Sequence, residues 1–435
     1  MKWFADVALL PAGPARDVLF EVSGDRFSKV SPGAVIGSAR RLPGVVLPGF
    51  ANTHSHAFHR AIRGRTHSGG GTFWTWRERM YQVAARLDPE SYLALARATY
   101  AEMALAGMTS VGEFHYLHHA PGGARYAEQN VMAEALRQAA ADAGIRLTLL
   151  DTCYLAGGLD GTGHQPLQGP QLRFGDGDAE RWAARAGAIK ASAGMVVGSA
   201  IHSVRAVPRE QLGTVAGTRP GAPLHLHLSE QPAENAACQQ YYGATPTGLL
   251  AGAGVLGPAT TAVHATHLTP ADITILGSSR TTACFCPTTE RDLADGIGPA
   301  RALRDAGSAL SLGSDQHAVI DAFEEARSLE MDERLQSLQR GRFSPAELLA
   351  ALTAHASIGW PDAGRLQAGA LADLVAVRLD TVRTAGSAPE QVLLSAAASD
   401  VHTVLVGGKL VVENGRHRLG NVAGLLAQAI DPLCA

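Results

Sequence analysis

Apolar runs of strand length recur along the chain, and each is followed by a segment with helical spacing. The segments between the runs include the alanine-containing stretches 89–107 and 130–144, each closed by the glycine that commonly ends a helix. Eight strand-then-helix units over roughly 300 residues predict a (β/α)8 TIM barrel. The runs occupy residues 45–54, 109–116, 146–155, 195–204, 223–230, 260–268, 281–288 and 309–317.

The two ends of the chain follow a different pattern. Residues 1–48 hold short apolar segments separated by Pro and Gly, which is typical of small strands. After about residue 365 the β character returns, and a hairpin is expected across Gly407 and Gly408. We expect these strands to pair, so that residues 1–48 plus 365–420 form a small β-sandwich-like module beside a barrel of residues 49–364.

Composition limits the class of partner. The 435 residues are 46% hydrophobic and carry a net charge of -3, so the field needed to attract nucleic acid or an anionic membrane is missing. The first residues lack a signal-peptide pattern, and no apolar stretch reaches membrane-spanning length. Five cysteines in so long a chain predict reduced thiols rather than a disulfide framework. We therefore expect a cytoplasmic protein without nucleic-acid or membrane partners.

Polar residues gather where the predicted strands end, which is the face on which barrel enzymes carry their chemistry. His54 and His56 share one face of the first strand because side chains alternate along a strand, and so can bind one ion together. A single histidine is more often a core or surface residue than a ligand. Several strand ends that all present such residues favour a metal site instead. These residues are His54, His56, His225, His227, Glu230, His264, His267 and Asp315.

Imidazole nitrogens with a carboxylate suit Zn²⁺, and Fe²⁺ or Mn²⁺ can occupy the same kind of site. A divalent ion of this kind lowers the pKa of a water from 15.7 to about 7. The pattern therefore predicts a metal-dependent hydrolase, with the identity of the ion left open.

The motifs at these strand ends resemble the amidohydrolase superfamily, and within it most closely the formimidoylglutamate deiminase family. That family hydrolyses N-formimino-L-glutamate to N-formyl-L-glutamate and ammonia in histidine degradation. The resemblance spans about residues 45 to 320. It is carried by HSHAFHRA, FWTWRERMY, EFHYLHH, HSVRAV, HLHLSEQ, VHATH, CPTTERDLADGI and GSDQH.

The resemblance implies one divalent ion per chain and a homodimer. The bridging lysine of two-metal relatives has no candidate after the run at 195–204. In the family we expect Gln where this chain has His59. The implied metal ligands are His54, His56, His227 and Asp315; the implied catalytic residues are Glu230, His264 and Asp315; and the implied substrate contacts are His59, Arg77, Tyr116, His202 and Arg205.

The implied substrate is a dicarboxylate, and an arginine fork binds a carboxylate through two parallel hydrogen bonds. We expect Arg77 and Arg205 at strand ends as its partners. The alternative is that Arg77 lies on a helix and makes surface ion pairs. The glycine-rich residues 64–76 predict a loop whose Phe73, Trp74 and Trp76 cover the site, although ordinary packing of these aromatics fits equally well.

Two other interpretations of the chain's function remain open. A related deaminase that acts on a nucleobase-like ring would need a flat aromatic slot rather than two arginines. A barrel that has lost its chemistry should lack at least one ligand. Cys284 and Cys286 lie in a predicted buried strand and are interpreted as small core residues.

Overall fold

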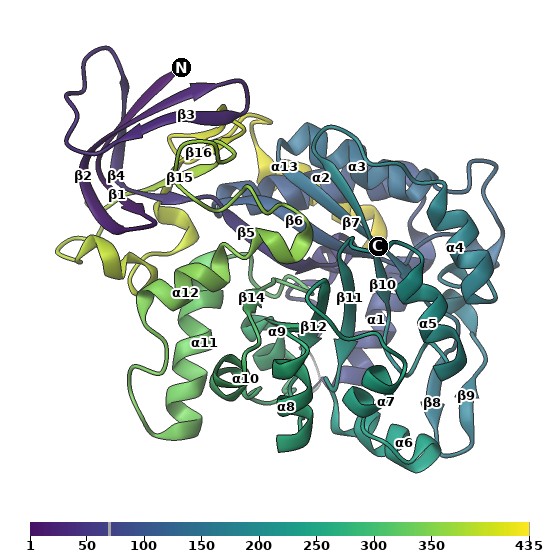
Figure 1. Ribbon diagram of the computed structural model, residues 1–435. Coiled ribbons are helices and arrows are strands. Elements are labelled where there is room, and N and C mark those ends of the chain that lie inside the picture. Colours follow the sequence, from purple (N-terminus) through teal and green to yellow (C-terminus); the bar gives the residue numbers. More distant parts are fainter. Residues whose placement is uncertain (68–70, 435) are drawn as a thin grey trace.

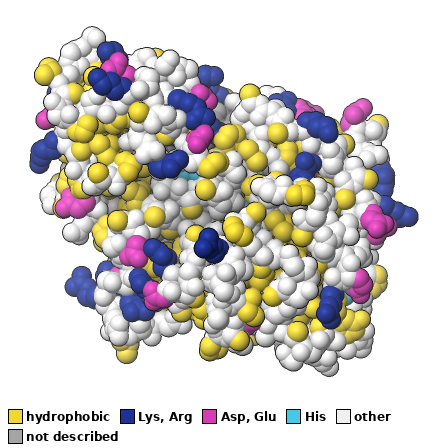
Figure 2. All heavy atoms as spheres, in the orientation of Figure 1, with side chains coloured by type: hydrophobic (Ala, Val, Ile, Leu, Met, Phe, Trp, Pro, Cys, Tyr) yellow, Lys and Arg dark blue, Asp and Glu magenta, His cyan; other side chains and the backbone are white. Residues whose placement is uncertain are grey.

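The computed structural model describes the backbone of residues 1–67 and 71–434, with the side chains of Phe73 and Trp74 left out (Figure 1). Two large sheets organise the chain, and each contains eight strands. Among the described residues, none of the helices combines the length and the apolar character needed to cross a bilayer. On the face drawn in Figure 2, basic and acidic side chains are interspersed over the surface.

The first sheet is the predicted barrel. Its neighbouring strands pair in parallel in chain order, and a bridge between Ser55 and Asp315 joins the first strand to the end of the last. Each of the eight predicted runs contributes one strand to the barrel, although only the second half of the run at 45–54 does so. Their bounds are β5 (Phe50–Ser55), β6 (Met108–His115), β7 (Arg146–Cys153), β10 (Met195–Ile201), β11 (Leu224–Leu228), β12 (Thr260–His264), β13 (Thr282–Phe285) and β14 (Leu310–Leu312).

Helices follow the strands, as the βα pattern predicts. The helix that follows Asp88 begins with a capping box, in which the side chains of Asp88 and Ser91 each bond the other residue's backbone N–H. The helix before Gly144 ends there because the glycine adopts a left-handed conformation, with φ 83°. The helices are α1 (Phe73–Arg86), α2 (Pro89–Leu105), α3 (Val131–Ala143), α4 (Ala179–Gly187), α5 (Arg209–Gly217), α6 (Pro232–Tyr242), α7 (Pro246–Gly252), α8 (Pro270–Ser278), α9 (Pro287–Asp292), α10 (Ala300–Ala306), α11 (Ala322–Ser337) and α12 (Pro345–Leu352).

The second sheet unites both ends of the chain, and Figure 1 shows its purple N-terminal strands beside the yellow-green β15 and β16. The strand order is β18-β17-β16-β15-β4-β1-β2-β3, so the expected pairing of N- and C-terminal segments is confirmed. The hairpin across Gly407 and Gly408 is also present. The division of domains at residues 48 and 364 stays a prediction. The strands are β1 (Lys2–Leu10), β2 (Gly13–Ser23), β3 (Arg26–Ser31), β4 (Arg40–Pro48), β15 (Leu374–Val377), β16 (Val401–Val406), β17 (Lys409–Glu413) and β18 (Arg416–His417).

The run at residues 45–54 is not one strand. It divides at Gly49: β4 pairs with β1 and β15 in the outer sheet, whereas β5 pairs with β6 in the barrel. A Cβ at Gly49 would lie 2.4 Å from the side chain of Thr109, so only glycine allows the chain to pass here. The apolar run therefore serves two sheets in succession.

Two further segments differ from the prediction. Residues 34–39 form no strand, and Val35 is 85% exposed. The last helix, α13 (Val422–Cys434), has no counterpart among the predicted elements, and it packs its apolar face against α2 on the outside of the barrel. The apolar residues of α13 follow the last predicted β segment, and only the tertiary structure shows that α2 covers its apolar face.

The N-terminal end of the barrel is closed by the short helix η4 (His355–Ile358). His355 contacts the backbone carbonyl of Gly49 at 2.8 Å and the Ser110 hydroxyl at 2.7 Å. His225, one pleat below His227, contacts the Ser357 carbonyl at 3.0 Å. His225 therefore belongs to the contacts that close the N-terminal end of the barrel and lies outside the candidate metal cluster.

Candidate metal and active site

Four buried side chains converge at the C-terminal end of the barrel, from β5 and the residue directly after it, from β11, and from the segment after β14. Nε2 of His54 lies 3.2 Å from Nε2 of His227 and 3.3 Å from Oδ1 of Asp315. Nε2 of His56 lies 3.3 Å from the same carboxylate oxygen. The four predicted metal ligands are thus brought together around one point.

The hydrogen bonds behind the imidazoles orient them toward that point. Nδ1 of His56 lies 2.9 Å from the Phe114 carbonyl, and Nδ1 of His227 lies 2.8 Å from the His202 carbonyl. A carbonyl only accepts, so each Nδ1 carries the proton and each Nε2 presents a lone pair to the centre. Burial lowers the pKa of His56 to about 3, which keeps its ring neutral. Lone pairs facing one another beside a carboxylate are the donor set that a divalent ion requires.

The backbone at the strand ends is strained in a way that aims these side chains. Ser229, His264 and Asp315 have positive φ values of 49°, 69° and 43°, in the left-handed region that non-glycine residues rarely adopt. At Gly313 an added Cβ would lie 2.7 Å from Cβ of His54, so the two strands approach closely only because this residue is glycine.

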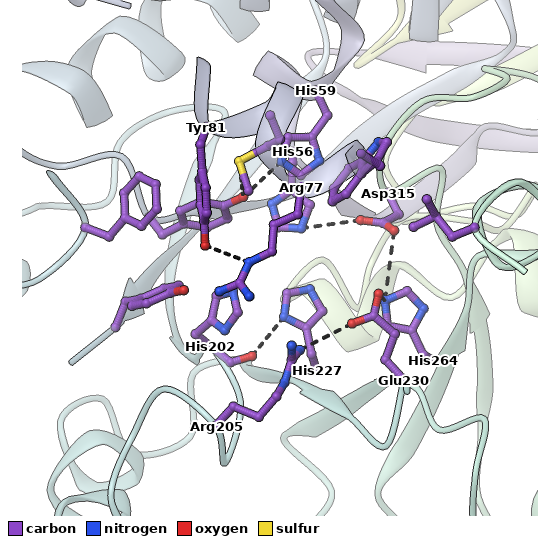
Figure 3. A pocket seen from close by; sticks show the side chains of 16 residues that line it. His56, His59, Arg77, Tyr81, His202, Arg205, His227, Glu230, His264 and Asp315 are labelled. Atoms are coloured by element: carbon purple, nitrogen blue, oxygen red, sulfur yellow. Dashed lines mark hydrogen bonds and ion pairs between the residues drawn. The ribbon is translucent and has the colours of Figure 1, made fainter. Parts of the chain in front are cut away.

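Glu230 and His264, predicted as catalytic residues, lie beside the cluster (Figure 3). Nε2 of His264 is 3.8 Å from Oε1 of Glu230 and 3.9 Å from Oδ2 of Asp315. On the other side of the ring, Nδ1 of His264 lies 3.3 Å from Oε1 of Glu290. Burial lowers the pKa of His264, but these carboxylates outweigh it and raise the pKa well above its usual value.

The pocket opens from this cluster and is lined by all five predicted substrate contacts. His59 is buried, and its Nε2 lies 2.9 Å from the Tyr116 hydroxyl. The ring of His202 packs against that of Tyr154, with centroids 4.2 Å apart. These residues are His59, Arg77, Tyr116, His202 and Arg205.

Arg77 does not lie at a strand end as expected. It belongs to α1, which begins at Phe73 inside the predicted loop because Thr72 caps the helix. Its side chain turns inward, and Nε donates to the Tyr81 hydroxyl at 2.7 Å while Nη2 donates to the Gly157 carbonyl at 3.2 Å. The helical placement matches the alternative interpretation, but the side chain turns inward and lines the pocket.

Of the three aromatic residues expected to cover the site, the structure describes the side chain of one. Trp76 is buried and lines the pocket, which fits both the covering role and ordinary packing. Residues 68–70 and the side chains of Phe73 and Trp74 lie outside the described residues.

Arg205 follows β10 and is held between two carboxylates. Its Nη2 lies 3.3 Å from Oε2 of Glu230, and its Nε lies 2.9 Å from Oε2 of Glu234, an ion pair without the alignment of a hydrogen bond. Glu234 was not among the predicted site residues. Its signal in the sequence is weak, because it is only an acidic residue in the first turn of the helix after Glu230.

Several aromatic residues of the pocket were also not predicted. Tyr81 lies one helical turn after Arg77, and Tyr154 directly follows β7, the same kind of position as the predicted strand-end residues. Both positions were readable from the pattern. Phe174 directly follows the short helix η3 (Gly169–Arg173) and had no comparable signal in the sequence.

In a second cluster of potential metal ligands, the carboxylate is already paired with an arginine. His115, His118 and Asp151 lie near one another, but both oxygens of Asp151 accept hydrogen bonds from Arg185 at 2.9 Å. Trp182 Nε1 donates to the same carboxylate at 2.8 Å. A guanidinium occupies the place that a cation would take, so this cluster is a structural ion-pair network.

The remaining singled-out residues are structural. Cys284 and Cys286 are fully buried free thiols in the core, as predicted. His267 lies beyond β12, and its Nε2 is 2.8 Å from the Asp295 carbonyl, outside the metal cluster.

Comparisons with known proteins agree with this geometry. The model of the Amidohydrolase family matches residues 45–411. A formimidoylglutamate deiminase from Pseudomonas aeruginosa is 37% identical over 434 residues, which cover 95% of each chain, and an 8-oxoguanine deaminase from the same species is 32% identical over 88% of this chain and 86% of that one.

Solved structures have the same architecture. An amidohydrolase from Brucella melitensis superposes with a TM-score of 0.92 at 32% identity, with complete coverage of both chains. An adenosine deaminase from Xanthomonas campestris with bound zinc has a TM-score of 0.84 at 23% identity, covers 98% of this chain and 96% of its own, and supports the fold alone. The chain therefore belongs to the amidohydrolase family and is a hydrolase that acts on a carbon–nitrogen bond.

Proposed function

We propose that this enzyme hydrolyses N-formimino-L-glutamate to N-formyl-L-glutamate and ammonia, as a step of histidine degradation. The observation that carries the proposal is the presence of two arginines, Arg77 and Arg205, in the pocket that opens from the candidate metal cluster. A substrate with two carboxylates and an amidine carbon at the metal matches that arrangement of charge. The similarity to a formimidoylglutamate deiminase supports the same choice.

The metal centre in this proposal holds one divalent ion, with zinc expected and iron or manganese as alternatives. His54, His56, His227 and Asp315 would hold it, since their nitrogen and oxygen donors already face one point. When bound, the ion would make a water nucleophilic at neutral pH. A homodimer is expected from the family and is open to test by light scattering.

The chain's own residues move the protons. Water adds to the formimino carbon, and Glu230 and Asp315 take a proton from it and pass it to the terminal nitrogen. The same carboxylates then move the remaining hydroxyl proton of the adduct to that nitrogen. As a C=O bond forms, the bond from carbon to that nitrogen breaks, so ammonia leaves and the formyl group stays on the glutamate. His264, held by Glu290 at 3.3 Å, orients the water and stabilises charge that develops during the addition.

The arginines select the substrate. Nη1 of Arg205 makes no hydrogen bond to any described residue, so this edge of the guanidinium is available for a carboxylate. Arg77 reaches the pocket from α1, whereas Arg205 reaches it from the segment after β10. A charge-assisted pair contributes about 1.5 to 3 kcal/mol, which corresponds to about tenfold or more in kcat/KM.

A second candidate is the deamination of a nucleobase-like ring. It is favoured by the aromatic residues Tyr81, Tyr154 and Phe174 in the pocket and by the similarity to an 8-oxoguanine deaminase. Such a ring carries no pair of carboxylates, so it would make no charge-assisted bonds to the guanidinium groups of Arg77 and Arg205.

Ammonia release from purified protein separates the candidates. The substrates are formiminoglutamate, formiminoglycine, 8-oxoguanine, guanine, cytosine and adenosine. Formiminoglutamate should be hydrolysed much faster than formiminoglycine, and Arg205→Met should reduce that preference. Efficient turnover of a nucleobase, or indifference to the second carboxylate, would overturn the proposal and leave the metal-dependent hydrolase intact.

A further inference from the structure

Glu234 occupies an unusual position beside the pocket. It lies in the first turn of α6, is 1% exposed, and faces two different segments of the site. Its Oε1 accepts a hydrogen bond from the Ser229 N–H at 3.2 Å, and its Oε2 lies 2.9 Å from Nε of Arg205. Each carboxylate oxygen therefore has a separate partner.

The first partner belongs to the strained end of β11. Ser229 has a φ of 49°, and it directly precedes Glu230. A left-handed conformation at a non-glycine residue persists only where the surroundings stabilise it. The hydrogen bond from the Ser229 N–H to Glu234 is one such contact. Glu234 therefore helps to hold the backbone from which the side chain of Glu230 extends.

The second partner is the guanidinium assigned to substrate binding. Arg205 lies between Glu230 and Glu234, and without the second carboxylate its nearest anionic partner would be Glu230, at 3.3 Å. A guanidinium drawn toward Glu230 would turn away from the substrate and engage the proposed proton carrier. Burial raises the pKa of the Glu234 carboxyl and the charge of Arg205 opposes that rise, so the two groups depend on each other.

We infer that Glu234 is a positioning residue, which anchors Arg205 so that one edge of the guanidinium faces the substrate and which thereby sets the preference for a dicarboxylate. The inference rests on the proposed function, because it assigns the free edge of Arg205 to a substrate carboxylate. Glu234 touches neither the metal cluster nor the main pocket, since it lines only the adjoining hollow beyond Arg205. It therefore acts through Arg205.

Glu234→Gln is the informative substitution. An amide has one acceptor oxygen and no charge, so it cannot keep both the hydrogen bond from the Ser229 N–H and the ion pair with Nε of Arg205. The preference for formiminoglutamate over formiminoglycine, measured as a ratio of kcat/KM, should fall at least about fivefold. KM for formiminoglutamate should rise, while KM for formiminoglycine changes little.

A double-mutant cycle distinguishes positioning from general support. In the Arg205→Met background, Glu234→Gln should change the ratio less than about twofold, because the residue through which it acts is gone. Where Arg205→Met does not fold, Arg205→Gln replaces it, since its amide can still donate to a carboxylate. Metal content and the thermal midpoint are measured for every variant.

Glu330→Gln is the matched control. Glu330 is also a fully buried glutamate that accepts backbone N–H bonds and pairs with an arginine, Arg334, but it lies on α11. This variant should lower the thermal midpoint and leave the substrate ratio unchanged.

The outcomes separate the inference from the proposed function. Equal effects of Glu234→Gln in both backgrounds, no effect, or a rise in the preference would overturn the positioning role alone. A substrate ratio that Arg205→Met leaves unchanged would overturn the carboxylate-binding role of Arg205, and with it both the proposed function and this inference.

Discussion

Replacing Glu230 with Gln separates proton transfer from structural support. The amide has nearly the same shape as the carboxylate and still offers an oxygen to Arg205, whose Nη2 is 3.3 Å away. It cannot take a proton from water. We therefore expect Glu230→Gln to keep its fold and its metal and to lose most of its activity.

The two effects differ in size. Exchanging a charge-assisted hydrogen bond for a neutral one costs about 1 kcal/mol of folding stability, and Arg205 keeps its pair with Glu234 at 2.9 Å. Loss of a general base lowers kcat by about 10² to 10⁴, which corresponds to about 2.7 to 5.4 kcal/mol in the activation barrier. The chemical effect should therefore exceed the effect on stability.

The assay measures ammonia release from formiminoglutamate at saturating substrate, with metal content by elemental analysis and the thermal midpoint on the same sample. A variant that retains activity within a few fold of the parent would refute the assignment of Glu230 as proton carrier. Loss of metal together with activity would instead point to Glu230 as a ligand.

Three further predictions concern the metal ligands, the partner of His264 and a buried histidine of the outer sheet. Elemental analysis of protein purified without added metal should find one divalent ion per chain; Asp315→Ala should abolish turnover and weaken metal binding, and two ions per chain, or none with full activity, would contradict the site. Glu290→Ala should lower kcat more than Glu290→Gln, with KM little changed, because the amide still accepts at the atom that now lies 3.3 Å from Nδ1 of His264; equal loss in both variants would argue for the charge alone. Burial lowers the pKa of His417 to about 4, so its folded form prefers the neutral ring, and the stability that it contributes is complete above the unfolded pKa of about 6.5 and is lost as the pH falls toward 4. The thermal midpoint should fall across this window, and His417→Gln, which can still donate to the Ala143 carbonyl, should make the fall shallower.

The periodic features of the chain were predictable because their causes are local. Alternation of apolar runs with helical segments predicted the eight barrel strands, and glycines such as Gly144 marked helix ends. The i, i+2 spacing of His54 and His56 placed both imidazoles on one face, where both approach the carboxylate of Asp315. These properties depend on the pleat of a strand and on backbone conformation, which neighbouring residues set.

Other features depended on which segments meet in space. The apolar run through Gly49 looks continuous in the sequence. Its two halves nevertheless pair in different sheets, because the first half lies beside β15 and the second half beside β6, and both partner strands are distant in the sequence. Arg77 lines the pocket because α1 lies beside it. His225 lies outside the metal cluster because its side chain contacts η4, which closes the other end of the barrel.

The charge arrangement around Arg205 is likewise a tertiary property. Glu234 and Glu290 look like ordinary acidic residues of helix first turns, and spacing alone assigns them no partner. Only the folded chain places the one 2.9 Å from Arg205 and the other 3.3 Å from His264. The sequence by itself determined the barrel and the residue types at its strand ends, because both follow from local periodicity. The tertiary structure decided which charges face one another, because electrostatic partners are set by distance in space and not by distance along the chain.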